Sequence, residues 1–293
     1  MKKILISENQ YNKVKSFLLE SKLRSYVFDW DDNILRMPTK IYLKSDKGDI
    51  IGMGTEEFAH HRTDLGKKPF NYNGHTIVGF DEDPFRDFTD YKAFLRDAEW
   101  ALHHEKFAPS YKKFIEALTY ASSFAINTAR GHNPEALKDG VKLFINIVLD
   151  PSEKKVMLQN ITKELPKELT KGLNNTQLLD LYLDERGEYY PVSSEEFGKK
   201  FGIDVSGGAR NPEHAKQVAI EHFIKKLIDG VKTHMVNGKY KKISLGFSDD
   251  DIRNVHGVTE FIENQLSKMY PEVHFVIYDT SMGSKKKIVI EKD

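Results

Sequence analysis

The feature that most constrains the fold is a series of short apolar runs that end in polar residues and are separated by segments with helical periodicity. Continuous apolar runs of this length are typical of strands that are buried on both faces of a parallel sheet. The series predicts an α/β chain with a Rossmann-like, doubly wound parallel sheet. The runs are SYVFDW (25–30), SSFAINTARG (122–131), KKISLGFSDDD (241–251), VHFVIYDTS (273–281) and a final edge strand, KKKIVIEK (285–292).

Helices are predicted between these runs. Helical spacing of apolar residues covers residues 111–120 and 258–269, and an amphipathic helix is predicted near the N-terminus, after Ser7. Two further helices begin with the same tripeptide, at Asn133-Pro134 and Asn211-Pro212. Asn can cap a helix and Pro fits its first position, so both tripeptides predict helix starts.

The composition excludes several classes of protein. Hydrophobic residues make up 39% and charged residues 30% of the 293 residues, which is typical of a globular chain. Lys plus Arg and Asp plus Glu number 44 each, so net charge gives no attraction to nucleic acid or to a membrane. There is no cysteine, which excludes disulfides and thiolate sites. With no run that could span a bilayer, we expect a cytoplasmic protein without a membrane partner.

Two stretches, residues 36–108 and 150–208, interrupt the alternation and are rich in charge, Gly and turn signals. We interpret both as insertions into one elaborated domain, whose core comprises residues 1–35, 109–149 and 209–293. The segments at 46–58 and 185–197 match in character position by position, and each predicts a hairpin followed by a capped helix. Convergent turn chemistry and two matching cap elements both explain the match.

Two acids stand where the first run ends. In open α/β sheets, ligands bind beyond the carboxyl ends of the strands. Asp29 and Asp31 flank Trp30 at that position, so both carboxylates can face one ligand. One can attack phosphorus as a nucleophile, while the other protonates the leaving oxygen and later activates water.

Anion-binding residues follow the second run. The hydroxyl of Thr128 and the backbone amides from Ala129 to Gly131 can hold phosphate oxygens, and Arg130 can add a bidentate contact. Lys216 lies one turn inside the helix predicted after Asn211, where its ammonium can neutralise both phosphate and nucleophile.

Three consecutive acids, Asp249, Asp250 and Asp251, follow the third run. Clustered carboxylates are hard oxygen ligands of the kind that Mg²⁺ accepts. We expect Asp249 and Asp250 to bind Mg²⁺ together with Asp29 and Asp31, because the ion would offset repulsion between these acids and a phosphate. Each motif alone is weak evidence for a function, and the order of the four motifs along the chain is stronger evidence.

In this order, DWDDN, NTARG, the helical lysine and SDDD resemble the four sequence motifs of the haloacid dehalogenase (HAD) superfamily. The resemblance implies a HAD-like core with cap insertions after the first and second motifs. The first motif departs from the family pattern at Asn33, where Thr or Val is usual, and at Asp32, where Gly is frequent. The implied roles are nucleophile for Asp29, general acid/base for Asp31, phosphate-binding hydroxyl for Thr128, third-motif lysine for Lys216 and metal-binding acids for Asp249 and Asp250.

We therefore expect a magnesium-dependent phosphate monoester hydrolase that forms an aspartyl-phosphate. The resemblance implies that an aspartate at the first position favours phosphoryl transfer over dehalogenation, although phosphomutases and phosphotransferases share this aspartate. The phosphorylated substrate stays open: a nucleotide, a nucleic-acid end or a small phosphometabolite. One alternative is a catalytically silent HAD-fold binding or structural protein. Another is a polynucleotide 3′-phosphatase, in which the lysines within 239–242 could contact a nucleic-acid backbone.

The first insertion also contains candidate substrate contacts. Its basic residues could meet an anion, although solvated surface is the simpler interpretation. Its aromatic residues could stack on a nucleobase, although packing is the simpler interpretation. The two sets are His60, His61, Arg62, Lys67, Lys68, His103 and His104, and Phe70, Tyr72, Phe80, Phe85, Phe88 and Tyr91.

Overall fold

The computed structural model of the chain describes residues 22–205, 212–234, 242–284 and 286–290. Its main sheet has six strands in the order β10-β9-β8-β1-β6-β7. Neighbouring strands are parallel, except that β10 pairs antiparallel with β9 at the edge. The predicted α/β class with a mostly parallel sheet is confirmed. The strands are β1 (Lys22–Phe28), β6 (Ser123–Thr128), β7 (Gly187–Pro191), β8 (Lys242–Asp249), β9 (Val273–Asp279) and β10 (Lys286–Val289).

The strand order reverses at β1. The chain leads from β1 to β6 and β7 on one side, and then returns to place β8 and β9 on the other side. Where the order of an open parallel sheet reverses, the connections on the two sides diverge and leave a crevice at the carboxyl ends of the strands. The ends of β1 and β8 therefore lie at the position where such a sheet binds its ligand.

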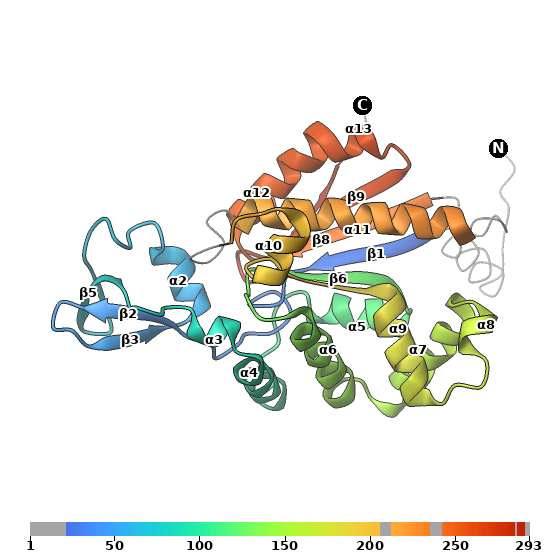
Figure 1. Ribbon diagram of the computed structural model, residues 1–293, viewed down its shortest axis with the longest axis horizontal. Coiled ribbons are helices and arrows are strands. Elements are labelled where there is room, and N and C mark those ends of the chain that lie inside the picture. Colours follow the sequence, from blue (N-terminus) through green and yellow to red (C-terminus); the bar gives the residue numbers. More distant parts are fainter. Residues whose placement is uncertain (1–21, 206–211, 235–241, 285, 291–293) are drawn as a thin grey trace, which may run out of the picture.

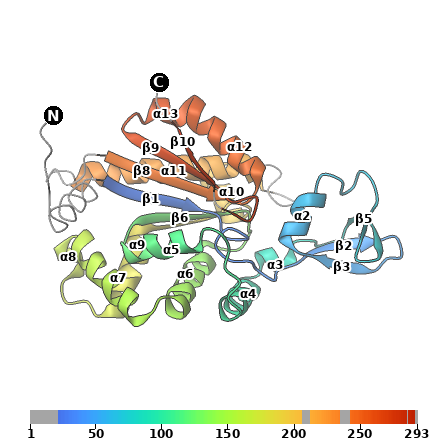
Figure 2. The ribbon, with the colours of Figure 1, turned by 180° about the vertical axis from the view of Figure 1, so that it is seen from behind.

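Helices cover both faces of this sheet (Figures 1 and 2). Alternate residues of β1 enter different cores: Tyr26 and Phe28 pack with the helices from α4 to α9, whereas Val27 packs with α11 and α12. This explains why the strands are apolar without alternation. The helices are α4 (Tyr91–His103), α5 (Tyr111–Thr119), α6 (Pro134–Val148), α7 (Pro151–Glu164), α8 (Lys167–Thr170), α9 (Asn175–Arg186), α10 (Glu195–Phe201), α11 (Pro212–His234), α12 (Ile252–Phe261), η2 (Ile262–Leu266) and α13 (Ser267–Met269).

Two helix starts can be compared with the sequence. Asn133 caps α6 as predicted, because its side chain accepts the amide of Ala136 and Pro134 is the first helical residue. The helix predicted from Val258 begins earlier, at Ile252, because Asp251 serves as its N-cap. The N-terminal helix and Asn211 lie outside the described residues.

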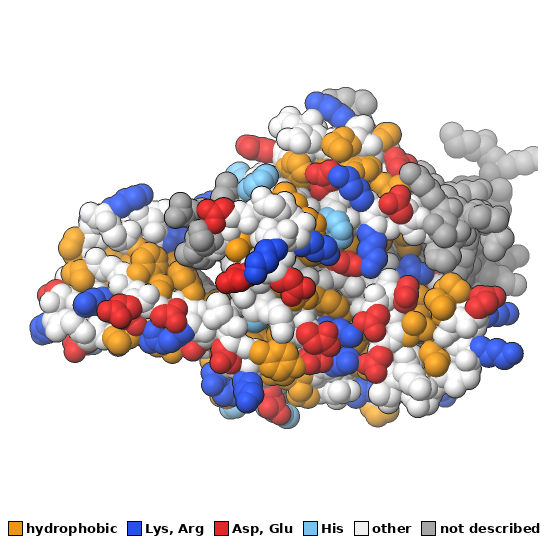
Figure 3. Space-filling view, viewed as in Figure 1, with side chains coloured by type: hydrophobic (Ala, Val, Ile, Leu, Met, Phe, Trp, Pro, Cys, Tyr) orange, Lys and Arg blue, Asp and Glu red, His pale blue; other side chains and the backbone are white. Residues whose placement is uncertain are grey.

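Residues 41–80 form a separate antiparallel module beyond the carboxyl ends of the main strands (Figure 1). Its sheet has the order β3-β2-β5-β4, and its small core contains Leu43, Met53 and Ile77. Ile50, Val78 and Phe80 stay exposed, and hydrophobic side chains gather over this module in Figure 3. The module, called the cap module below, comprises β2 (Ile41–Ser45), β3 (Ile50–Met53), α2 (Thr55–His61), β4 (Phe70–Tyr72) and β5 (His75–Phe80).

Parts of both irregular stretches belong to the core. From the first stretch, α4 packs on α6, and the short helix α3 (Arg86–Thr89) joins α4 to the cap module. From the second, β7 joins the main sheet beside β6. The expected second hairpin is also wrong, because residues 185–186 end α9 and β7 pairs parallel with β6. No helix in the described part of the chain has both the length and the apolar character of a membrane span.

Candidate active site

Three carboxylates converge at the ends of β1 and β8. The parallel register pairs Phe28 with Ser248, so the next residues, Asp29 and Asp249, emerge side by side. The amide of Asp29 donates to the carbonyl of Ser248 at 3.0 Å, which fixes the two strand ends together. One carboxylate oxygen from each of Asp29, Asp249 and Asp250 lies within 4.8 Å of the other two. Adjacent strands thus bring together acids that are 220 positions apart in the sequence.

Lys216 joins this group from helix α11. Its Nζ lies 2.7 Å from Oδ2 of Asp249 and 3.1 Å from Oδ2 of Asp29, and its side chain is 1% exposed. Burial by itself lowers the pKa of Lys216, but the carboxylates of Asp249 and Asp29 outweigh burial and raise the pKa above its ordinary value. The lysine is therefore a fixed positive charge between the two strand ends.

The acids carry more negative charge than Lys216 balances. When all three carboxylates are ionised, one ammonium leaves two negative charges unbalanced. Burial raises the pKa of Asp29 to about 7, although Lys216 lowers it and the carboxylates of Asp249 and Asp31 raise it further. Burial and the carboxylates of Asp29, Asp249 and Asp32 raise the pKa of Asp250 well above its usual value, although Lys216 lowers it. A divalent cation bound by oxygen ligands would match both the excess charge and the donor type, so these residues fit Mg²⁺.

Asp31 is held apart from the three converging acids. Arg130 binds it in a bidentate manner, with Nε 2.8 Å from Oδ2 and Nη2 2.7 Å from Oδ1. The hydroxyl of Thr128 lies 3.5 Å from Oδ2 of the same carboxylate. Asp31 and Thr128 are thus neighbours as the motif order predicts, but the Asp31 carboxylate lies against Arg130 and is not part of the acid group.

The loop after β6 differs from the phosphate cradle predicted for it. The guanidinium of Arg130 is fully buried against Asp31, and the amide of Gly131 donates to the carbonyl of Phe88 at 3.0 Å. Nε and Nη2 of Arg130 and the amide of Gly131 are therefore occupied, and Nη1 of Arg130 is buried without a hydrogen-bond partner among the described residues. Of the rest of the predicted set, Ala129 is exposed at the end of β6, whereas Thr128 is buried and its hydroxyl lies against Asp31.

Buried amides and hydroxyls hold the strand ends in place, and the sequence did not single them out. The side-chain amide of Asn33 donates to the Asp29 carbonyl at 3.0 Å and to Oγ of Ser248 at 2.9 Å. Its oxygen accepts the hydroxyl of Thr280, which also donates to the Asp249 carbonyl at 2.9 Å. Asn33 therefore links the loops after β1, β8 and β9, which explains its presence where the resemblance expects Thr or Val.

Two further amides position Lys216 and Asp249. The Nδ2 of Asn127, on β6, donates to the backbone carbonyl of Lys216 at 3.1 Å. The Nδ2 of Asn254, on α12, donates to Oδ1 of Asp249 at 3.0 Å. An asparagine inside an apolar strand, as in SSFAINT, is the sequence signal that could have revealed the first of these contacts.

Helix α2 of the cap module contacts the rim of this site at both ends. At its first residue, the hydroxyl of Thr55 donates to Oδ2 of Asp32. At its C-cap, the guanidinium of Arg62 lies 2.9 Å from Glu213 and 3.3 Å from Asp251. Asp32 follows Asp31 directly and Asp251 follows Asp250, so α2 extends between the two acidic loops of the site.

The remaining candidates of the first insertion mostly make local contacts. His61 stacks on Phe70, with ring centroids 4.4 Å apart. Lys68 pairs with Asp64, and His103 lies 3.9 Å from Glu99. His104 contacts a helix carbonyl, Tyr91 donates to Asp139, His60 and Lys67 are exposed, and Phe70, Tyr72, Phe80, Phe85 and Phe88 pack in or against the cap module. Of the three lysines at 239–242, Lys239 and Lys241 lie outside the described residues, and Lys242 begins β8.

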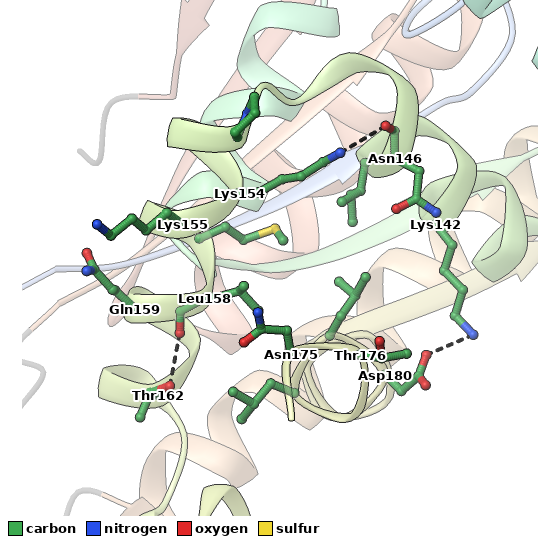
Figure 4. Close-up of a pocket in the computed structure, with 15 residues that line it drawn as sticks. Lys142, Asn146, Lys154, Lys155, Leu158, Gln159, Thr162, Asn175, Thr176 and Asp180 are labelled. Atoms are coloured by element: carbon green, nitrogen blue, oxygen red, sulfur yellow. Dashed lines mark hydrogen bonds and ion pairs between the residues drawn. The ribbon is translucent and has the colours of Figure 1, made fainter. Parts of the chain in front are cut away.

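A groove of about 770 Å³ between α6, α7 and α9 lies apart from these acids (Figure 4). Its charged side chains interact locally: Lys142 pairs with Asp180, and Lys154 donates to the carbonyl of Asn146. The groove offers apolar side chains and amides, but no nucleophile beside a base. We therefore assign the candidate site to the strand ends.

A scan against protein-family models finds no match, and searches of the curated proteins and of the solved structures also find none.

Proposed function

We propose that the chain is a magnesium-dependent phosphate monoester hydrolase with a HAD-like core that acts through an aspartyl-phosphate. The observation that carries the proposal is the contact of Lys216 with both Asp29 and Asp249 at the point where the strand order reverses. What supports the proposal is that a carboxylate, a buried ammonium and two further carboxylates converge at one strand end. Perturbed carboxylates in such a position are typical of functional sites.

In the proposed reaction, a carboxylate oxygen of Asp29 forms a bond to phosphorus while the bond to the leaving oxygen breaks. Asp31 lies beside the reacting group, protonates the leaving oxygen in the first step and takes a proton from the attacking water in the second. Water then attacks phosphorus and releases inorganic phosphate and free Asp29.

The chain's other residues hold the charges in these steps. Lys216 orients Asp29 and attracts the phosphate, and the hydroxyl of Thr128 with the amide of Ala129 is proposed to hold phosphate oxygens. Asp29, Asp249 and Asp250 would hold Mg²⁺, which would supply charge neutralisation for the phosphate and the carboxylates.

The test is phosphate release from a panel of phosphorylated substrates with and without Mg²⁺, followed by Asp29→Asn. The panel includes p-nitrophenyl phosphate, nucleotides, small phosphometabolites and a 3′-phosphorylated oligonucleotide. We expect Mg²⁺-dependent turnover that Asp29→Asn removes while the protein stays folded, and a phosphorylated Asp29 peptide in acid-quenched wild type. The matched control is Asp184→Asn, because Asp184 is an exposed acid that pairs with Lys138. Absence of release from the whole panel would overturn the proposal.

A further inference from the structure

Arg130 is a buried arginine: Nε and Nη2 of its guanidinium are hydrogen-bonded on one side, and Nη1 is buried without a hydrogen-bond partner among the described residues. Its side chain is 0% exposed. Nε and Nη2 grip the two carboxylate oxygens of Asp31 at 2.8 and 2.7 Å, and Nη2 also lies 2.8 Å from the hydroxyl of Thr39. A planar guanidinium in a bidentate pair fixes the orientation of the carboxylate as well as its position.

Two aromatic rings pack against the guanidinium of Arg130, and a second carboxylate binds the threonine to which Arg130 donates. Its guanidinium carbon lies 4.7 Å from the ring centre of Phe88 and 5.0 Å from that of Phe94. The hydroxyl of Thr39 donates in turn to Asp97 at 2.8 Å, and Asp97 is itself buried. These contacts restrict the guanidinium, so the carboxylate that it grips is restricted as well.

The backbone around Arg130 is also fixed. Its carbonyl accepts the amide of Ser193 at 3.2 Å, and the following amide, of Gly131, donates to Phe88 at 3.0 Å. A side chain at Gly131 would lie 3.1 Å from Thr89 and 3.3 Å from the Ser193 carbonyl, so the loop has little room to rearrange. A buried ion pair is weak evidence for a stabilising role, because a protein with two apolar side chains in its place is often equally stable. A geometric role explains the arrangement better.

We propose that Arg130 is a positioning residue that orients the carboxylate of Asp31 toward the reacting group. The inference rests on the proposed phosphatase function. Arg130 acts through Asp31 and makes no contact with the phosphate. Thr39 lies just before the cap module and Phe88 packs against its core, so both chain segments that lead into and out of the module support the same arginine. The cap module and Asp31 are therefore mechanically connected through Arg130.

The first test compares Arg130→Met with wild type and repeats the comparison in an Asp31→Asn background. Because small misplacements of a catalytic group cost rate, we expect kcat to fall by about 100-fold. KM and the inhibition constant of inorganic phosphate should stay within about threefold of wild type, and the same substitution should add little in the Asp31→Asn background. If Arg130 instead bound the phosphate, Arg130→Met would raise KM and the phosphate inhibition constant. It would also lower kcat/KM further in the Asp31→Asn background. That result would overturn the inference.

The second test restores the missing group chemically. Guanidinium ion added to Arg130→Gly can occupy the space beside Phe88 and Phe94, and we expect it to recover at least about tenfold in kcat where urea does not. Phe88→Leu, a milder change that leaves Arg130 in place, should lower kcat several-fold at unchanged KM and keeps the test decisive if the arginine variants fail to fold. Unchanged kcat in Phe88→Leu, or equal rescue by urea, would count against the inference.

The matched control is Arg253→Lys. Arg253 also grips one aspartate through two nitrogens, at 3.1 and 2.9 Å from Asp251, but its side chain is 37% exposed. We expect its kcat to match wild type. If wild type releases no phosphate from any substrate, the proposed function and this inference fail together. If wild type is active and Arg130→Met keeps its kcat, this inference alone fails.

Discussion

The ammonium of Lys216 lies 2.7 Å from a carboxylate oxygen of Asp249 and 3.1 Å from one of Asp29, and thereby joins helix α11 to the ends of β8 and β1. The three side chains are buried, so the charge of each is stabilised in the folded protein by the opposite charge beside it. Folding and the candidate chemistry therefore share the same contact.

The first prediction concerns the loss of this ammonium. Lys216→Met should lower the free energy of unfolding by about 3–5 kcal/mol, because two buried carboxylates lose their counter-charge. Urea denaturation measures the change. Lys226→Met, which removes a half-exposed partner of Glu188, is the control and should cost less than about 1 kcal/mol. Equal losses in the two variants would contradict the buried role of Lys216.

The second prediction concerns the pH dependence of Mg²⁺ binding. Burial raises the pKa of Asp29 from 3.8 to about 7, so the folded metal-free protein binds this proton more tightly than the unfolded chain does. The resulting stabilisation is complete below about pH 3.8 and is lost as the pH rises through about 7. Because Mg²⁺ competes with protons for the carboxylates, it should raise the Tm more at pH 8 than at pH 5.5.

Thermal unfolding in EDTA and in MgCl₂ at both pH values measures this difference. Asp250→Asn should reduce the Mg²⁺-dependent rise in Tm, and the exposed Asp184→Asn should leave it unchanged. A rise that is the same at both pH values would mean that protons and Mg²⁺ do not compete at these acids.

The third prediction concerns His132, a 2% exposed histidine beside Phe94. Burial, with a smaller contribution from Arg130, lowers its pKa from 6.5 to about 3. Below about pH 6.5, His132 therefore binds a proton in the unfolded chain but stays neutral in the folded protein. The free energy of unfolding falls as the pH falls below that value. Between pH 7 and pH 5, the loss from this group should approach about 2 kcal/mol.

His132→Asn should lack this acid-dependent loss, whereas the exposed His103→Asn should retain it in full. Urea denaturation at a series of pH values between 5 and 7 gives the slopes. If wild type and His132→Asn lose stability in parallel, His132 is protonated in the folded protein and the prediction is wrong.

The fourth prediction concerns the contact of Arg62 with Glu213 and Asp251. Arg62→Met should change global stability by less than about 1 kcal/mol, because the pair is partly exposed. Hydrogen exchange in α2 should nevertheless become at least several-fold faster, because the helix loses its tie to the core at that end. Lys68→Met removes a pair within the cap module and should leave exchange in α2 as it is. Unchanged exchange in Arg62→Met would show that Thr55 alone holds the helix.

Much of the sheet could be predicted from the sequence because its strands are buried on both faces. Tyr26, Val27 and Phe28 are apolar in succession, and such a run permits few other structures. Strand β7 was assigned to a hairpin in an insertion because its sequence, GEYYP, has no such run, whereas it pairs parallel with β6 in the main sheet. Asp251 was counted with the acids although it caps α12, since an acid before a helix and an acid at a metal site look alike in a sequence.

The candidate site was predictable where neighbouring strand ends bring residues together, as for Asp29 and Asp249. Arg130 was predicted to bind phosphate because the sequence shows that it follows a strand. The sequence does not show which side chains it contacts. Thr39 is 91 positions away from it, and only the packed chain shows that the two meet. Asn33 was noted as a departure from a pattern, and its links to Ser248 and Thr280 span more than 200 positions.

The cap module enters and leaves the core through one narrow neck. The amide of Tyr42 donates to the carbonyl of Pro84, and the amide of Asp81 donates back to the carbonyl of Tyr42. The two chain segments therefore lie side by side at the base of the module, so residues 43–80 begin and end at nearly the same place, and α2 adds contacts with the core through Thr55 and Arg62. A short turn between Tyr42 and Asp81 would bridge the gap, and protein engineers could graft other modules onto the same core at this neck.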